Sequence, residues 1–118
     1  MLKDHHMVTS DKALSSFEAL VMIEKRALQV PQHMYKLLLV DFSMPGLDGP
    51  SLTIEVIKFC QQNGLEIPHV CCCTAYSQLN YQKSAQQAGM KSFLTKPVCE
   101  HKLSQLIKDA KLRIYNEL

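Results

Sequence analysis

Short apolar runs and longer amphipathic stretches alternate along the chain. Leu37–Val40 is the clearest run, with four apolar residues in a row. An unbroken run of this length predicts a strand that is buried on both faces, as in a parallel sheet. The segments 67–74 and 91–95 predict two more strands, and His6–Thr9 is a candidate for a short first one.

Apolar residues at helical spacing follow each of these runs, which predicts a helix after each strand. For the first helix, Ser10 or Asp11 is a suitable amino-terminal cap, and the segment 29–32 is a suitable end. The apolar stripe of this helix is wide, as expected of a face that packs on a core. It comprises Ala13, Leu14, Phe17, Leu20, Val21 and Leu28.

Three further helices have clear boundaries. Pro50 suits the first turn of the second helix, and Asn63-Gly64 suits its end. We expect a more polar third helix over Gln78–Ala88, capped by Ser77. The last helix has the strongest periodicity and is expected to run nearly to the end of the chain. Its apolar face comprises Leu103, Leu106, Ile107, Ala110 and Ile114.

Strand and helix thus alternate four times. This order predicts a doubly wound α/β fold with a parallel sheet. The length of 118 residues is enough for one domain with one core, so we expect residues 1–118 to form a single domain.

The charge of the chain excludes some classes of function. Thirteen basic and 11 acidic side chains give a formal net charge of +2, which is too small to indicate binding to nucleic acid or to an anionic membrane. We find no membrane span or signal peptide pattern. Membrane attachment is therefore expected only through a longer parent protein.

The five cysteines are predicted to be structural. Cys71, Cys72 and Cys73 are consecutive in a predicted strand, where neighbouring side chains point to opposite faces and cannot easily pair. The absence of a Cys-x-x-Cys pair argues against a metal site. Small buried thiols of this kind are typical of a reducing compartment, so we expect a cytoplasmic protein.

Three predicted strands end in residues that can do chemistry: Asp41, Thr74 and Lys96. Each also has a plain structural explanation, as a turn cap, a strand end and a solvated lysine. However, the carboxyl ends of parallel strands meet at one edge, where α/β proteins bind ligands. The segment 37–49, Thr74-Ala75 and Lys96-Pro97 resemble, in order and spacing, the receiver domain of two-component response regulators.

The resemblance implies a flavodoxin-like fold and phosphoryl transfer from a phosphohistidine on a histidine kinase or a phosphotransfer protein. Asp41 would be the phosphoacceptor. Lys96 would offset charge on the phosphoryl oxygens, and Thr74 would donate a hydrogen bond to them. The domain would be a stoichiometric phosphoacceptor rather than an enzyme, either within a hybrid sensor kinase or as a stand-alone regulator.

The resemblance also assigns supporting roles. The Asp41 carboxylate and the backbone carbonyl of Ser43 would bind Mg²⁺, and the N–H of Ala75 would add a hydrogen bond to the phosphoryl group. Phe93 occupies the position of the aromatic switch, which rotates inward when Thr74 moves to the phosphate. Pro97 matches a cis-proline that directs the lysine before it into the site.

The resemblance is incomplete at the amino terminus. The first strand of the family ends in a pair of acidic residues, and neither that strand nor the helix after it has a counterpart here. Asp4 and Asp11 lie in the wrong context to replace the pair. We therefore expect weak Mg²⁺ binding or none. We also expect Leu37–Val40 to lack a neighbouring strand, a state that favours association.

Two alternatives to phosphate acceptance remain. A degenerate receiver would act only by binding partners, through residues 78–88 and 98–118. A haloacid-dehalogenase-like phosphatase also has an Asp after a buried strand, but its second Asp, two residues later, is replaced here by Ser43. That replacement argues against the phosphatase.

Overall fold

The computed structural model describes residues 11–43, 45–75 and 79–109. These residues form a three-stranded parallel sheet in the order β1-β2-β3, flanked by helices. The strands are β1 (Leu37–Asp41), β2 (His69–Thr74) and β3 (Ser92–Thr95); the helices are α1 (Ser16–Gln29), α2 (Gly49–Gln62), α3 (Leu79–Ala88) and α4 (Glu100–Asp109), with a 3-10 turn, η2 (Pro31–His33). The predicted α/β class and three of the predicted strands are confirmed. The candidate strand His6–Thr9 and the end of the last helix lie outside the described residues.

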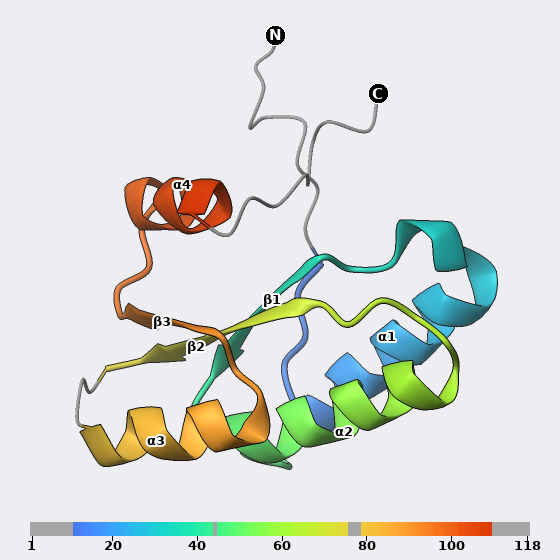
Figure 1. The fold of residues 1–118 in the computed structure, drawn as a ribbon, viewed down its shortest axis with the longest axis horizontal. Helices are drawn as coiled ribbons and strands as arrows, with labels where there is room; N and C mark the ends of the chain where they lie inside the picture. The colour runs from blue at the N-terminus through green and yellow to red at the C-terminus, as the bar shows by residue number, and fades with distance from the viewer. Residues whose placement is uncertain (1–10, 44, 76–78, 110–118) are drawn as a thin grey trace, which may run out of the picture.

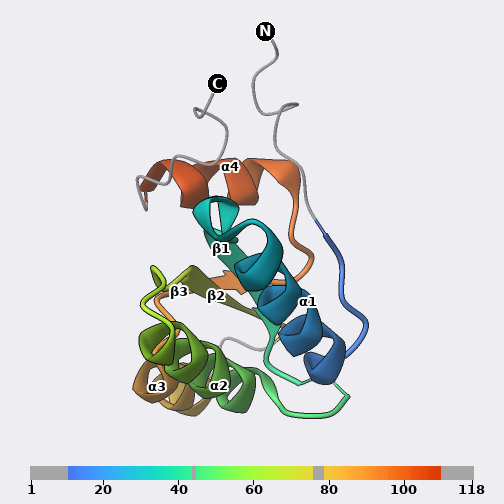
Figure 2. The ribbon, with the colours of Figure 1, turned by 90° about the vertical axis from the view of Figure 1, so that its right-hand side faces the viewer.

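Helices cover the two faces of the sheet in separate layers. α4 lies on one face, and α2 and α3 lie on the other, with α1 beside α2 (Figures 1 and 2). The core is on the side of α2 and consists of Ile23, Val40, Leu52, Val56, Cys60, Val70, Cys72, Ala85 and Met90. On the other side, Leu106 and Ile107 of α4 are buried, as the helical pattern predicts. No described helix has the length and apolar character needed to cross a membrane.

β1 is an edge strand within the described part of the chain. One side of β1 pairs with β2 along its whole length, and no described strand pairs with the other side. Val40 is 4% exposed and belongs to the core, but Leu39 on the opposite face is 44% exposed. The prediction of a strand buried on both faces is therefore wrong for the face of Leu39, because no described neighbour covers it.

α1 begins later than the sequence predicts. The Ser15 Oγ accepts a hydrogen bond from the Glu18 N–H at 3.1 Å, which makes Ser15 the amino-terminal cap. The prediction of Ser10 or Asp11 as the cap is wrong. The carboxylate of Asp11 instead accepts hydrogen bonds from the Tyr35 hydroxyl at 2.6 Å and from the Arg26 guanidinium at 3.0 Å. Arg26 lies in the last turn of α1, so Asp11 is held near the carboxyl-terminal end of this helix and not at its start.

The apolar stripe predicted for α1 is largely exposed. Only Ser16 and Ile23 of α1 are buried, and Leu20 is partly buried against the core. The exposed members of the stripe are Leu14, Phe17, Val21 and Leu28. Helical periodicity correctly predicts an apolar face, but only the part of it at Leu20 packs against the described core.

The turn between β1 and α2 is fastened to the start of α1. The Ser16 Oγ donates a hydrogen bond to the Pro45 carbonyl at 3.2 Å and accepts one from the Leu47 N–H. Gly46 has a φ of 90° and lies against this hydroxyl; a Cβ there would come within 2.3 Å of the Ser16 Oγ. A side chain at Gly46 would therefore both strain the backbone and displace α1.

Candidate functional site

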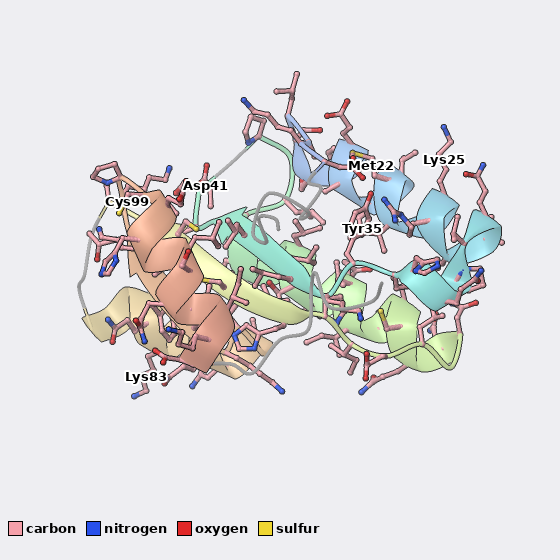
Figure 3. The ribbon with its side chains drawn as sticks, turned by 90° about the horizontal axis from the view of Figure 1, so that it is seen from above. Met22, Lys25, Tyr35, Asp41, Lys83 and Cys99 are labelled. Carbon is pink, nitrogen blue, oxygen red and sulfur yellow. The ribbon has the colours of Figure 1, made fainter. Side chains whose placement is uncertain are left out.

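The structure brings Asp41 and Lys96 together from two strands that are not adjacent. The Lys96 Nζ lies 2.9 Å from the Asp41 Oδ1, and each side chain is 45% exposed. Figure 3 shows Asp41 at the end of β1, on the same side of the molecule as Cys99 near the start of α4. The predicted meeting of an acid and a lysine at the carboxyl edge of the sheet is therefore present.

Backbone contacts fix the direction in which the chain leaves Asp41. The Phe42 N–H donates to the Cys73 carbonyl at 3.0 Å, which extends the pairing of β1 with β2 by one residue. The Gly49 N–H donates to the Phe42 carbonyl at 2.8 Å and closes the turn. A Cβ on Gly49 would lie 2.4 Å from the Asp41 carbonyl oxygen, so only glycine fits this close approach. The sequence places Gly49 in the turn but does not reveal this contact.

Asp48 closes the same turn as the amino-terminal cap of α2. Its Oδ1 accepts a hydrogen bond from the Ser51 N–H at 2.9 Å. Hydrogen bonds from the side chain and the backbone of Ser51 hold the pKa of Asp48 below its ordinary value. Asp48 is thus a turn and cap residue.

We expect Asp48→Ala to destabilise the domain by about 1 kcal/mol near neutral pH, because the cap is lost. The folded-state pKa of Asp48 is depressed. Its contribution is therefore present above the unfolded pKa and is lost as the pH falls through the folded pKa. Urea unfolding at pH 7 and at pH 3 should show a smaller difference between parent and variant at the lower pH. Asp48→Asn keeps an accepting oxygen and should stay close to the parent at pH 7; an equal loss in this control would contradict the capping role.

Lys96 is positioned by its own backbone as well as by its neighbours. Its N–H donates to the Thr74 carbonyl at 2.9 Å, which places it directly after the paired part of β3. The peptide bond between Lys96 and Pro97 is cis, as the resemblance implied. The hydrogen bond between the Lys96 N–H and the Thr74 carbonyl also joins Lys96 to the end of β2.

Two other predicted site residues, Thr74 and Phe93, lie in the neighbouring strands but on the opposite face of the sheet from Asp41. The register pairs Asp41 with Cys73, whereas Thr74, one residue later, pairs with Thr95. Thr74 is 9% exposed. Phe93 is partly buried and packs against the core on the side of α2. Since side chains alternate along a strand, Thr74 and Phe93 share the core face and Asp41 belongs to the other.

A cavity of about 730 Å³ opens beside Asp41 and Lys96 along the outer edge of β1. Its lining combines the site with an apolar wall: Ala13, Leu14, Ser15, Leu39, Asp41, Ser43, Pro45, Cys73, Lys96, Pro97 and Val98. The residues before α1 form one side, and the end of β1 forms the other. The sequence does not indicate that Cys73 or residues 13–15 line the site. Apolar patterning locates β1 and α1 along the chain but says nothing about the space between them in the fold.

The thiol of Cys73 belongs to a residue that lines this cavity. A hydrogen bond from Cys71 lowers the pKa of Cys73, burial opposes this shift, and Lys96 lowers the pKa while Asp41 raises it. The same hydrogen bond and burial raise the pKa of Cys71. All five cysteines are free. The prediction of buried structural thiols is confirmed for Cys60 and the three cysteines of β2 but is wrong for Cys99, which is exposed.

The donor atoms of the cavity do not fit Mg²⁺ well. Asp41 is the only carboxylate among the described lining residues, and its oxygen already meets the Lys96 ammonium. The described residues contain no group of three or more His, Cys, Asp or Glu suited to a metal ion. Magnesium prefers six oxygen ligands in octahedral geometry. Asp41 and the Ser43 carbonyl supply only part of such a set.

We therefore expect this chain to bind Mg²⁺ only weakly, with a dissociation constant in the millimolar range or higher. Titration with MgCl₂, followed by the NMR shifts of the Asp41 and Ser43 amides, measures this affinity. Lys96→Met removes the competing ammonium and should tighten binding modestly. Submillimolar affinity in the parent would contradict the prediction and would indicate further oxygen ligands.

Comparison with known families identifies the class of protein. The family model of the response regulator receiver domain matches residues 1–108. The chain therefore belongs to the response regulator receiver domain family. This family belongs to two-component signalling, and the chain has an α/β fold like that of CheY.

Individual relatives support this placement. The sensor protein GacS of Pseudomonas syringae pv. syringae is 35% identical over 79 residues, which are 66% of this chain and 9% of that protein. The sensor histidine kinase GacS of Pseudomonas protegens is 32% identical over 74 residues, which are 62% of this chain and 8% of that protein. The chain thus spans less than a tenth of the length of these curated relatives.

Two solved structures show the same fold. The receiver domain of the histidine kinase CKI1 from Arabidopsis thaliana, complexed with Mg²⁺ and BeF₃⁻, has a TM-score of 0.71 at 22% identity. The match covers 84% of this chain and 69% of that chain. The receiver domain of NtrX from Brucella abortus has a TM-score of 0.68 at 24% identity, over 90% of this chain and 80% of that chain.

Proposed function

We propose that this domain accepts a phosphoryl group on Asp41 from a phosphohistidine of a histidine kinase or a phosphotransfer protein. The observation that carries the proposal is the ion pair between Lys96 and Asp41 at the carboxyl edge of the sheet, with 2.9 Å between nitrogen and oxygen. A carboxylate so placed is open to an incoming phosphoryl group, and the ammonium can offset the charge that the group adds.

The bond changes of this reaction are simple. A carboxylate oxygen of Asp41 attacks the phosphorus and forms an acyl phosphate, and the P–N bond to the donor histidine breaks. The imidazole leaves with the bonding electrons and takes up a proton. Lys96 forms no bond to phosphorus; its ammonium moves from pairing with the carboxylate to pairing with the phosphoryl oxygens. The N–H of Ala75 is a proposed donor to the same oxygens. The hydroxyl of Thr74 is the other, once Thr74 moves from the core face toward the phosphate.

We further propose that residues 1–118 form one receiver domain that lacks the first strand and helix of the family, and that the domain acts in the cytoplasm. The exposed Leu39 and the cavity beside Asp41 support the first point. The free thiols support the second, since they fit a reducing compartment. The relatives named sensor kinases favour a role within, or in exchange with, a hybrid sensor kinase.

The test is chemical labelling of the chain by a small phosphodonor. Acetyl phosphate should transfer its phosphoryl group to Asp41, and borohydride reduction should then convert that residue to homoserine, which mass spectrometry detects. The same measurement is made on a chimera that carries the first strand and helix of the GacS receiver region. If neither protein is labelled, the domain takes no phosphate.

A receiver that acts only as a binding module is the second candidate. It is favoured by one observation: Asp41 is the only carboxylate among the described residues of the cavity. The labelling experiment separates the two candidates, because a binding module would take no phosphoryl group on Asp41. Such a module would also bind its partner equally well with Asp41→Asn.

A further inference from the structure

A lysine of α4 contacts the segment that carries Lys96. The Lys102 Nζ donates hydrogen bonds to the Thr95 carbonyl at 2.9 Å and to the Pro97 carbonyl at 3.3 Å. These two carbonyls belong to the residues immediately before and after Lys96. The Lys96 N–H is itself bound to the Thr74 carbonyl at 2.9 Å. The backbone around Lys96 is therefore held from both the sheet and α4.

The position of Lys102 on its helix is not explained by helix stability. Lys102 lies in the first turn of α4, which begins at Glu100. The positive end of the helix dipole is at this end, so a lysine there is unfavourable, whereas Lys108 in the last turn is favourable. The two carbonyl oxygens offset this repulsion, because charge-assisted hydrogen bonds are stronger than neutral ones.

We propose that Lys102 is a positioning residue for the Asp41–Lys96 pair. By holding the carbonyls on both sides of Lys96, it fixes the point from which the Lys96 side chain reaches Asp41. The same two hydrogen bonds connect the pair to α4, so a displacement of Lys96 toward a phosphoryl group is transmitted to this helix. The inference rests on the proposed function of Asp41, but the ion pair can be measured without any phosphorylation.

The experiment uses four variants of the 118-residue chain. Lys102→Met keeps most of the aliphatic length and removes the hydrogen-bond donors. Lys102→Arg keeps a cation that can reach the carbonyls. Lys108→Met removes an exposed lysine from the other end of the same helix and serves as the matched control. Lys96→Met gives the signal of a broken ion pair.

The readout is the NMR signal of the Asp41 carboxyl carbon, recorded together with the backbone amides of α4. We expect Lys102→Met to shift the carboxyl signal toward its value in Lys96→Met, Lys102→Arg to restore the parent value, and Lys108→Met to leave it unchanged. An unchanged Asp41 signal in Lys102→Met would overturn the proposal. So would a loss of the α4 amide signals in that variant, since Lys102 would then only hold the helix in place.

The outcome is separable from that of the proposed function. A parent chain that acetyl phosphate does not label would refute phosphate acceptance but would leave the NMR comparison valid. If Lys96→Met itself leaves the Asp41 signal unchanged, the ion pair does not form in solution and the positioning role fails. In a chain that is labelled, Lys102→Met should also slow labelling, and Lys102→Arg should restore the rate.

Discussion

The 118-residue chain should self-associate through the outer edge of β1, and Leu39→Lys should return it to a monomer. The Phe42 N–H donates to the Cys73 carbonyl. Because alternate residues of a parallel strand bond to opposite neighbours, the N–H and C=O groups of Leu39 face away from β2. No described strand pairs with this edge, and its exposed apolar side chain, 44% exposed at Leu39, makes it a template for pairing with another chain.

Sedimentation velocity over a range of protein concentrations measures this association. Leu39→Lys places a charge on the edge, which opposes strand pairing, and the exposed side chain leaves room for it. Ile54→Lys on α2 is the matched control, since Ile54 is 49% exposed and lies away from the edge. The control should associate as the parent does.

Three other results would contradict association through the edge. A monomeric parent whose Leu39 amide exchanges slowly with deuterium would mean that another segment of the chain covers β1. A monomer with a fast Leu39 amide and a sharp thermal transition would mean that the bare edge is tolerated. If both lysine variants dissolve the oligomer equally, the general gain in charge is responsible and not the edge.

The positions of the strands could be predicted from the sequence because a short run of apolar residues is a direct signal. Four apolar residues followed by an aspartate identified the end of β1, and the structure ends that strand at Asp41 itself. The approach of Lys96 to Asp41 followed from a general property of parallel sheets, namely that their carboxyl ends share an edge. Neither prediction required knowledge of any side-chain rotamer.

The orientation of α1 could not be predicted in the same way. α1 has more apolar residues than one packing face can bury. Ser16 is buried although it is polar and is not part of the predicted apolar stripe. The Ser16 hydroxyl donates a hydrogen bond to the Pro45 carbonyl, 29 residues further along the chain. Similarly, the role proposed for Lys102 depends on where the carbonyls of Thr95, at the end of β3, and of Pro97 point, which no local sequence pattern indicates.

Asp41→Asn should abolish phosphoryl labelling of the domain by acetyl phosphate, whereas Asp48→Asn should leave it unchanged. An amide is a far poorer nucleophile than a carboxylate, so the bond to phosphorus cannot form at position 41. Asp48 is the matched control because it lies in the same turn, and asparagine is as good a cap as aspartate. Equal labelling of Asp41→Asn and the parent would refute the proposed phosphoacceptor.

Lys96→Ala should slow labelling without abolishing it, because Lys96 offsets charge and does not form the bond. A preorganised donor in a site without water contributes roughly 10²–10³ in rate. Lys96 is 45% exposed, so water screens its charge and we expect a smaller loss, on the order of tenfold. Thr74→Ala should be labelled at a rate closer to that of the parent but should fail to move Phe93, whose ring signals in NMR report the response. A Lys96→Ala variant labelled as fast as the parent, or a ring of Phe93 that still shifts in Thr74→Ala, would show that these strand ends share an edge of the sheet without sharing the chemistry of Asp41.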